Sequence, residues 1–218
     1  LHLRDAQISD AGLEHLKRLT RLRGLDLFGT QVSGAGLRHL SEHTSLQVLA
    51  LAGPQVGDAR LVHLKGLTSL TDLQLGGPEV SDTGLEHLKG LTSLTDLNLA
   101  GNRIGGAGMK HFEGLTRLTR LRLSRTQATD AGLKHLEKLT SLQSLDVSHT
   151  EVTDAGLEQL KGLTTLTDLN LAGTKIGDTG LQHLNGLTRL QWLDVSQTPV
   201  TDAGREELKA ALPDCEIW

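Results

Sequence analysis

Three neighbouring residues carry the side-chain types of a hydrolase triad. Asp146, Ser148 and His149 bring a carboxylate, a hydroxyl and an imidazole into one short segment, and these groups serve nucleophilic acyl transfer. The chain repeats itself every 24 residues, however, and other copies hold unrelated side chains at the positions of Asp146 and Ser148. The grouping therefore reflects the repeat, and we expect no catalytic residues and no enzymatic activity.

Two further segments suggest ligand chemistry. The glycine-rich stretch GNRIGGAG at 101–108 lies between an expected strand and an expected helix, as a phosphate-binding loop does. It lacks the Lys-Ser/Thr ending, and GTKIGDTG at 173–180 fills the same positions, so turn formation explains it. Asp72 and Asp96 stack in adjacent repeats, but two carboxylates fall short of the roughly six to eight oxygen ligands of calcium. We therefore expect no cofactor and no metal.

Histidines recur at one position in the second half of the repeat. They are His15, His39, His63, His87, His111, His135 and His183. Gln159 and Glu207 occupy the two remaining copies. Neighbouring helices are about 10 Å wide, whereas zinc needs several nitrogens within about 2.1 Å, so packing explains the series better than metal binding. Because histidine gains charge below pH of about 6.5, we expect the folded chain to be sensitive to acid.

Leucines that recur with an unbroken period of 24 residues must form the elements that position these side chains. Leucines fall 24 residues apart at Leu22, Leu46, Leu70, Leu94, Leu118, Leu142, Leu166 and Leu190. Each begins the pattern LxxLxLxxTxV or a close variant of it. The alternating L-x-L core has the two-residue period of a strand with one buried face, so the side chains between the leucines are expected on the opposite face.

The second half of each repeat has the pattern of a helix. In TDAGLEQLKGL at 153–163, Leu157, Leu160 and Leu163 recur at helical spacing on one face. Asp154 stands at the expected helix start, where its carboxylate can cap the helix or interact with the helix dipole. Each repeat is therefore predicted to be a strand, a turn and a short helix.

These patterns resemble the leucine-rich-repeat family over essentially the whole chain. The short repeat is similar to those of GALA-type bacterial effectors and planctomycete-type proteins, and more distantly to the cysteine-containing repeats of F-box receptors. The position of that cysteine here holds Ala6, Thr30, Pro54, Pro78, Asn102, Thr126, Thr150, Thr174 and Thr198. The resemblance implies an α/β fold: a right-handed solenoid, or horseshoe, with a concave parallel β-sheet and convex short helices.

We expect a single domain over residues 1–218, made of about nine repeats that stack to close a continuous core. If each copy, including the one that opens at Leu1, forms a strand, nine strands about 4.8 Å apart give a sheet roughly 38 Å long. Residues 205–218 depart from the repeat and are expected to cap the C-terminal end. The chain opens at Leu1 within a repeat, which we interpret as a truncated N-terminus.

The positions between the buried leucines vary from copy to copy and form the candidate binding surface. We predict partner contacts from Arg120, Arg122, Arg125, Asp72, Asp96, Asn98, Asp146, Asp168, Asn170, Trp192 and Asp194. Arginine grips carboxylates or phosphates in a bidentate fork, and Trp with Arg dominates typical binding hot spots, so we favour Trp192 as an anchor. Two alternatives stay open: neighbouring Arg and Asp neutralise one another across strands, and Trp192 packs at the end of the solenoid.

Composition narrows the function classes. A net charge of −4 argues against a nucleic-acid clamp, and no run approaches the roughly 20 apolar residues of a membrane span. The one cysteine leaves localisation open between the cytoplasm and secretion as an effector, and the oligomeric state is also open. The leading hypothesis is a non-enzymatic module that binds a protein or peptide on its concave face. The alternatives are a recognition arm of a larger regulatory or effector protein, such as a ubiquitin-ligase-type receptor, and an engineered or structural scaffold.

Overall fold

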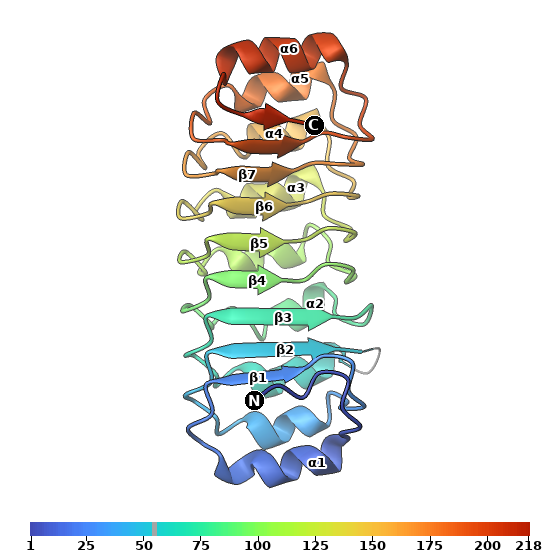
Figure 1. Ribbon diagram of the computed structural model, residues 1–218, viewed down its shortest axis with the longest axis vertical. Helices are drawn as coiled ribbons and strands as arrows, with labels where there is room; N and C mark the ends of the chain where they lie inside the picture. The colour runs from blue at the N-terminus through green and yellow to red at the C-terminus, as the bar shows by residue number, and fades with distance from the viewer. Residues whose placement is uncertain (54–55) are drawn as a thin grey trace.

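A computed structural model describes residues 1–53 and 56–218 of the chain (Figure 1). Within them lies one parallel sheet of nine strands, paired strictly in chain order. The strands are β1 (Gly24–Leu27), β2 (Val48–Ala52), β3 (Asp72–Gly76), β4 (Asp96–Asn98), β5 (Arg120–Arg122), β6 (Ser144–Asp146), β7 (Asp168–Asn170), β8 (Trp192–Asp194) and β9 (Glu216–Ile217). This arrangement confirms the predicted solenoid.

The 24-residue period of the sequence becomes the register of the sheet. Leu25 pairs with Leu49, and Leu49 with Leu73, so each coil places the same leucine beside its counterpart. Leu25 and Leu27 are buried while Gly24 and Asp26, which alternate with them, are partly exposed, as a strand with one buried face requires. The leucines of all coils form one continuous core.

The first and last strands of the sheet are not the ones that we expected. The first copy of the repeat contributes only an isolated bridge between His2 and Asp26. The ninth strand is instead β9, which follows the last helix and pairs Glu216 with Trp192 and Ile217 with Leu193. The C-terminal segment therefore extends the sheet by one strand, which the departure of residues 205–218 from the repeat pattern concealed.

Short helices pack behind the sheet and return the chain to the next strand (Figure 1). The α-helices are α1 (Asp10–Glu14), α2 (Asp82–Leu85), α3 (Asp130–Leu133), α4 (Asp154–Glu158), α5 (Asp178–Leu181) and α6 (Asp202–Ala211). The 3-10 helices are η1 (His15–Arg18), η2 (Gly36–Leu40), η3 (Asp58–Leu64), η4 (Gly108–Phe112), η5 (Lys134–Leu136) and η6 (Gln182–Leu184). Each helix of the described residues is too short or too polar to cross a membrane.

The aspartate at the helix start is not the N-cap, one of the two roles that we predicted for it, although it lies in the first turn, where a carboxylate interacts with the helix dipole. Thr153 is the N-cap of α4 and accepts from the Ala155 N–H, whereas Asp154 accepts the Gly177 N–H of the next coil at 2.7 Å. The same bond joins five other pairs of coils at 2.6 to 2.8 Å: Asp10 with Ser33, Asp58 with Ser81, Asp82 with Gly105, Asp130 with Thr153 and Asp178 with Thr201. Each carboxylate therefore joins two turns of the solenoid.

The turns after β1, β5, β6, β7 and β8 are closed by a hydroxyl instead of a cysteine. A threonine there donates to the carbonyl three residues earlier at 2.5 to 2.7 Å, in Thr30, Thr126, Thr150, Thr174 and Thr198. Asn102 also reaches the previous coil, because its Nδ2 donates to Leu75 O at 2.8 Å and to Leu99 O at 2.9 Å. Pro54 lies outside the described residues.

Candidate functional site

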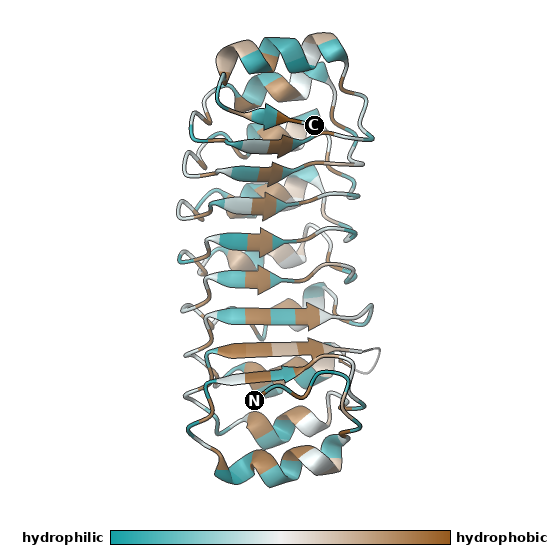
Figure 2. Ribbon diagram, in the orientation of Figure 1, coloured by the Kyte–Doolittle hydropathy of each residue, from teal (hydrophilic) through white to brown (hydrophobic). Residues whose placement is uncertain are grey.

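One face of the sheet is turned away from the helices, and we call it the open face. It is formed by the strand residues that alternate with the buried leucines (Figure 1). Its character changes along the solenoid. Figure 2 shows that β2 is hydrophobic throughout, whereas β3, β4, β5 and β7 each begin with a hydrophilic residue. The open face therefore offers an apolar region near the N-terminal end and a charged region beyond it.

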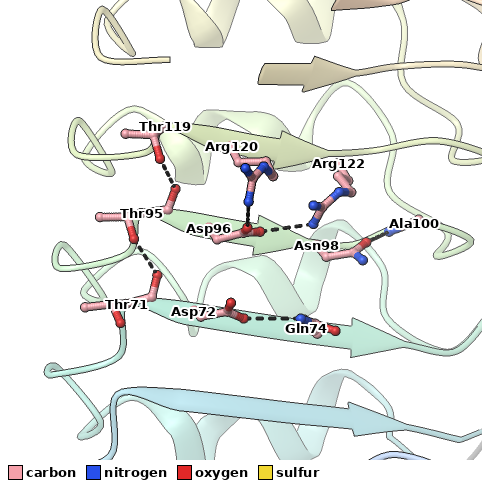
Figure 3. A network of polar contacts seen from close by, with 10 residues as sticks. All are labelled: Thr71, Asp72, Gln74, Thr95, Asp96, Asn98, Ala100, Thr119, Arg120 and Arg122. Atoms are coloured by element: carbon pink, nitrogen blue, oxygen red, sulfur yellow. Dashed lines mark hydrogen bonds and ion pairs between the residues drawn. The ribbon is translucent and has the colours of Figure 1, made fainter. Parts of the chain in front are cut away.

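The two strand arginines converge on one carboxylate. Arg120 Nη1 donates to Asp96 Oδ2 at 2.8 Å and Arg122 Nη1 donates to Asp96 Oδ1 at 3.1 Å (Figure 3). The register explains this arrangement, since Asp96 on β4 stands directly opposite Arg120 on β5. Neutralisation across neighbouring strands, which the sequence left open, occurs at this carboxylate. Together the two arginines and Asp96 carry one net positive charge.

Asp72 lies beside this cluster on β3, in register with Asp96. Burial and the neighbouring Asp96 carboxylate raise the pKa of Asp72 above its ordinary value of 3.8. The Gln74 amide donates to Asp72 along the same strand at 3.4 Å (Figure 3). Asp72 is thus a carboxylate that a cation would stabilise. Thr71, Thr95 and Thr119 bond along one edge of the same strands, each hydroxyl donating to a carbonyl of the previous coil.

Arg125 does not join the other two arginines in an ion pair. It lies in the turn after β5 with φ +56°, where other coils place Gly29, Gly101 and Gly173. A left-handed backbone costs a non-glycine residue about 1 kcal/mol or more. Arg125 is exposed, and none of the ion pairs among the described residues includes it.

The predicted aspartates beyond β5 bond only to their own strand segments. Asp146 accepts the Ser148 N–H at 2.9 Å, and Asp194 accepts the Ser196 N–H at 2.8 Å. Asp168 accepts the Thr167 hydroxyl at 2.6 Å. The predicted amides are bound in the same way, since Asn98 Oδ1 accepts the N–H of Ala100 and Asn170 Oδ1 that of Ala172.

Trp192 lies between two acidic residues on the open face. It is in register with Asp168 on β7 and with Glu216 on β9. Its side chain is partly exposed. Sequence reasoning did not include Glu216, because that residue belongs to the strand that the repeat pattern did not reveal.

An apolar area at the other end was not among the predicted contacts. Phe28 is 39% exposed and Val48 is 42% exposed. The Arg4 guanidinium lies 4.7 Å from the centre of the Phe28 ring and its Nε donates to Asp26 at 3.1 Å. The signal was present in the strand VLALA, where Val48 and Ala50 replace the polar residues of other copies.

The side chains that suggested a hydrolase triad or a metal site have other contacts in the fold. Ser148 Oγ donates to Asp146 at 2.7 Å, while the His149 ring lies over Gly173 in the next coil. In the helical series, His135 Nδ1 lies 2.7 Å from Glu113 Oε1, and burial lowers the pKa of His111. Among the described residues, no group of three or more His, Cys, Asp and Glu side chains is arranged to hold a metal.

Comparison with known proteins identifies the family of this sequence. The sequence matches the family model described as leucine rich repeat at residues 68–127, 92–152 and 140–200. No curated protein matches the sequence.

Three bacterial proteins of known structure are similar to this chain. An internalin C2 from Listeria monocytogenes has a TM-score of 0.75 and 25% identity, over 92% of this chain and 80% of that chain. An internalin from the same species has a TM-score of 0.69 and 22% identity, over 97% and 71%. A leucine-rich-repeat protein from Leptospira interrogans has a TM-score of 0.70 and 20% identity, and this chain spans 59% of its length. These likenesses confirm the predicted horseshoe fold and its bacterial type.

Proposed function

This chain belongs to the leucine-rich-repeat family, and we propose from that premise that it is a non-enzymatic module that binds a protein or peptide along its open, concave face. Members of the family commonly bind proteins and typically act as binding scaffolds. Among the described residues, every helix packs on the other side of the sheet, so this face is free for contact.

One observation carries the proposal: the open face varies while the architecture repeats. From β2 to β5 the first exposed position changes from Val48 through Asp72 and Asp96 to Arg120, although the adjacent leucine is the same in every coil. A purely structural repeat has no need for such variation. The predicted contacts on Arg120, Arg122, Arg125, Asp72 and Asp96 remain part of this proposal.

Site-specific cross-linking tests the proposal. A photoreactive amino acid replaces Gln74 on the open face in one variant and Glu158 on α4 in a second variant. After illumination in a cell lysate, we expect a discrete cross-linked protein from position 74 and none from position 158. Cross-linking from position 158 alone would overturn the proposal, because that side chain is exposed on the helical side.

A further inference from the structure

We infer that the open face over β6–β9 binds a lysine- or arginine-rich segment of another protein. This inference rests on the proposed function and specifies the chemistry of the partner. The residues that carry it are Asp146, Asp168, Trp192, Asp194 and Glu216, which we call the Trp192 patch. None of the described helices covers the patch.

The sheet register frames the indole with carboxylates. Trp192 is paired with Asp168 on one side and with Glu216 on the other. Asp194 follows two residues later on β8, and residues two apart in a strand share one face. The partly exposed indole thus has an acidic neighbour on each adjacent strand and another along its own strand.

These carboxylates differ from Asp96 and Asp26 on the open face, although Asp72 on β3 also lacks an ion pair among the described residues. Asp96 is paired with Arg120 and Arg122, and Asp26 is paired with Arg4. By contrast, none of the described ion pairs includes a member of the Trp192 patch, and strands β6–β9 contain neither lysine nor arginine. The described ion pairs thus engage Asp96 and leave the four carboxylates of β6–β9 without a bonded cation, although Arg122 stands in register with Asp146.

A cationic side chain fits both parts of this surface. An ammonium or guanidinium group is attracted to the face of an indole, and carboxylates form strong charge-assisted bonds with it. The hydrogen bonds of Asp146 and Asp194 to backbone N–H groups both use Oδ1, so each Oδ2 has no described partner. Charge complementarity therefore selects a basic partner and disfavours an acidic one.

The extent of the patch favours a peptide over a small cation. Three strand steps from β6 to β9 cover about 14 Å, the length of roughly four extended residues. A chain with several basic residues can contact successive carboxylates along this distance. A partner that spans the whole open face would place its basic segment here and an acidic group opposite Arg122.

The reporter for the test is the indole itself. The chain has two tryptophans, so a Trp218→Phe variant of the full chain leaves Trp192 as the only one. The probes are a dodecapeptide of alternating lysine and serine, its glutamate counterpart, and spermine. We expect saturable change in Trp192 fluorescence with the lysine peptide, weakening with added salt, and none with the glutamate peptide. Equal affinity for spermine and for the lysine peptide would overturn the assignment to a peptide.

Matched charge variants locate the binding. In the Trp218→Phe background, Asp168→Asn with Asp194→Asn should weaken the lysine peptide by about tenfold or more. Glu137→Gln with Glu158→Gln removes the same charge from exposed positions on the helical side and should leave affinity unchanged. Equal weakening by both pairs would overturn the inference, since attraction to net charge would then suffice. Trp192→Leu, followed by calorimetry, should weaken binding independently of the aspartates.

The two proposals fail in distinguishable ways. If position 74 cross-links a partner but the lysine peptide does not bind, the inference is wrong and the proposed function stands. If neither is observed, both are wrong. Melting curves for each variant verify that the fold is retained, and the choice of asparagine keeps an oxygen that accepts the Ser196 N–H beside position 194.

Discussion

Asp130 and Gly156, which stand in successive coils, fit together so closely that the glycine leaves no room for a side chain. A Cβ on Gly156 would lie 2.5 Å from Asp130 Oδ1. The carboxylate is fixed there, because it accepts the N–H of Thr153 at 2.8 Å and the Thr153 hydroxyl at 2.7 Å. Asp154 and Gly180 repeat the relationship one coil further on, again at 2.5 Å.

Gly156→Ala is therefore expected to destabilise the fold by about 2 kcal/mol, because overpacking strains a closed contact. Urea unfolding measures the change. Gly162→Ala is the matched control, since no atom lies within 4 Å of its added Cβ. Asp130→Gly should recover part of the loss in a double variant. The chain already carries such a pair, because Gly34 and Arg60 occupy the aspartate and glycine positions of two successive coils.

His43→Leu should stabilise the protein by about 1 to 2 kcal/mol, the cost of a buried polar atom that lacks a partner. His43 is fully buried where the next coil has Leu67, and its Nδ1 has no partner among the described residues. Its Nε2 lies 3.0 Å from Leu16 O, a carbonyl that the Leu19 N–H also satisfies. A lower urea midpoint for the leucine variant would show that the imidazole bridge outweighs the burial of leucine.

Thr201→Val should raise the pKa of Asp178 toward its ordinary value. The pKa is lowered because the backbone N–H of Thr201 and then its hydroxyl donate to the carboxylate. A lowered folded pKa adds stability above the ordinary value of 3.8, and that stability is lost as the pH falls through the folded pKa. Because its Asp178 pKa lies closer to that of the unfolded chain, the valine variant should lose less free energy of unfolding than the parent between pH 5 and 3. Carbon NMR titration of Asp178 checks this, with the exposed Thr179→Val as control; an unchanged pKa in the Thr201 variant would contradict it.

Arg122→Glu should leave the fold intact while sharply reducing capture of the cross-linked partner. The Arg122 ion pair with Asp96 is partly buried, but Arg120 still pairs with Asp96 in the variant, so the loss of stability should be about 1 kcal/mol. The same variant should bind the lysine peptide no more weakly than the parent chain, since its change lies outside the Trp192 patch. Lys134→Glu on η5 is the control of equal charge change. Undiminished capture by Arg122→Glu would reject the arginines as contacts.

Much of the fold followed from the sequence because its determinants are local and periodic. The leucine at each strand centre, as in Leu49 and Leu73, predicted both the buried face and the register that the structure has. The first and ninth strands were predicted less well. His2 forms only a bridge, whereas Glu216 joins the sheet 24 residues after Trp192, in the period of the repeat. That strand was concealed because Ala211 and Asp214 replace two leucines of the repeat before it.

The candidate surface could be predicted as a set of positions but not as a charge pattern. Alternation placed Asp96, Arg122 and Asp168 on one face. Which of them neutralise one another depends on side-chain reach between strands, and no local pattern encodes it. The contacts of Asp130 between coils could not be predicted for the same reason, since Thr153 and Gly156 are 23 and 26 residues away.

By itself, the sequence determined that the chain coils every 24 residues around a leucine core, because one coil with an exposed leucine face gains burial only by stacking on another. Only the tertiary structure decided that Asp96 is neutralised, while Asp168, Asp194 and Glu216 flank a partly exposed Trp192 and form no ion pair within the described part of the chain. Ion pairing requires a distance of a few ångströms between groups far apart along the chain, and that distance exists only once the coils are stacked.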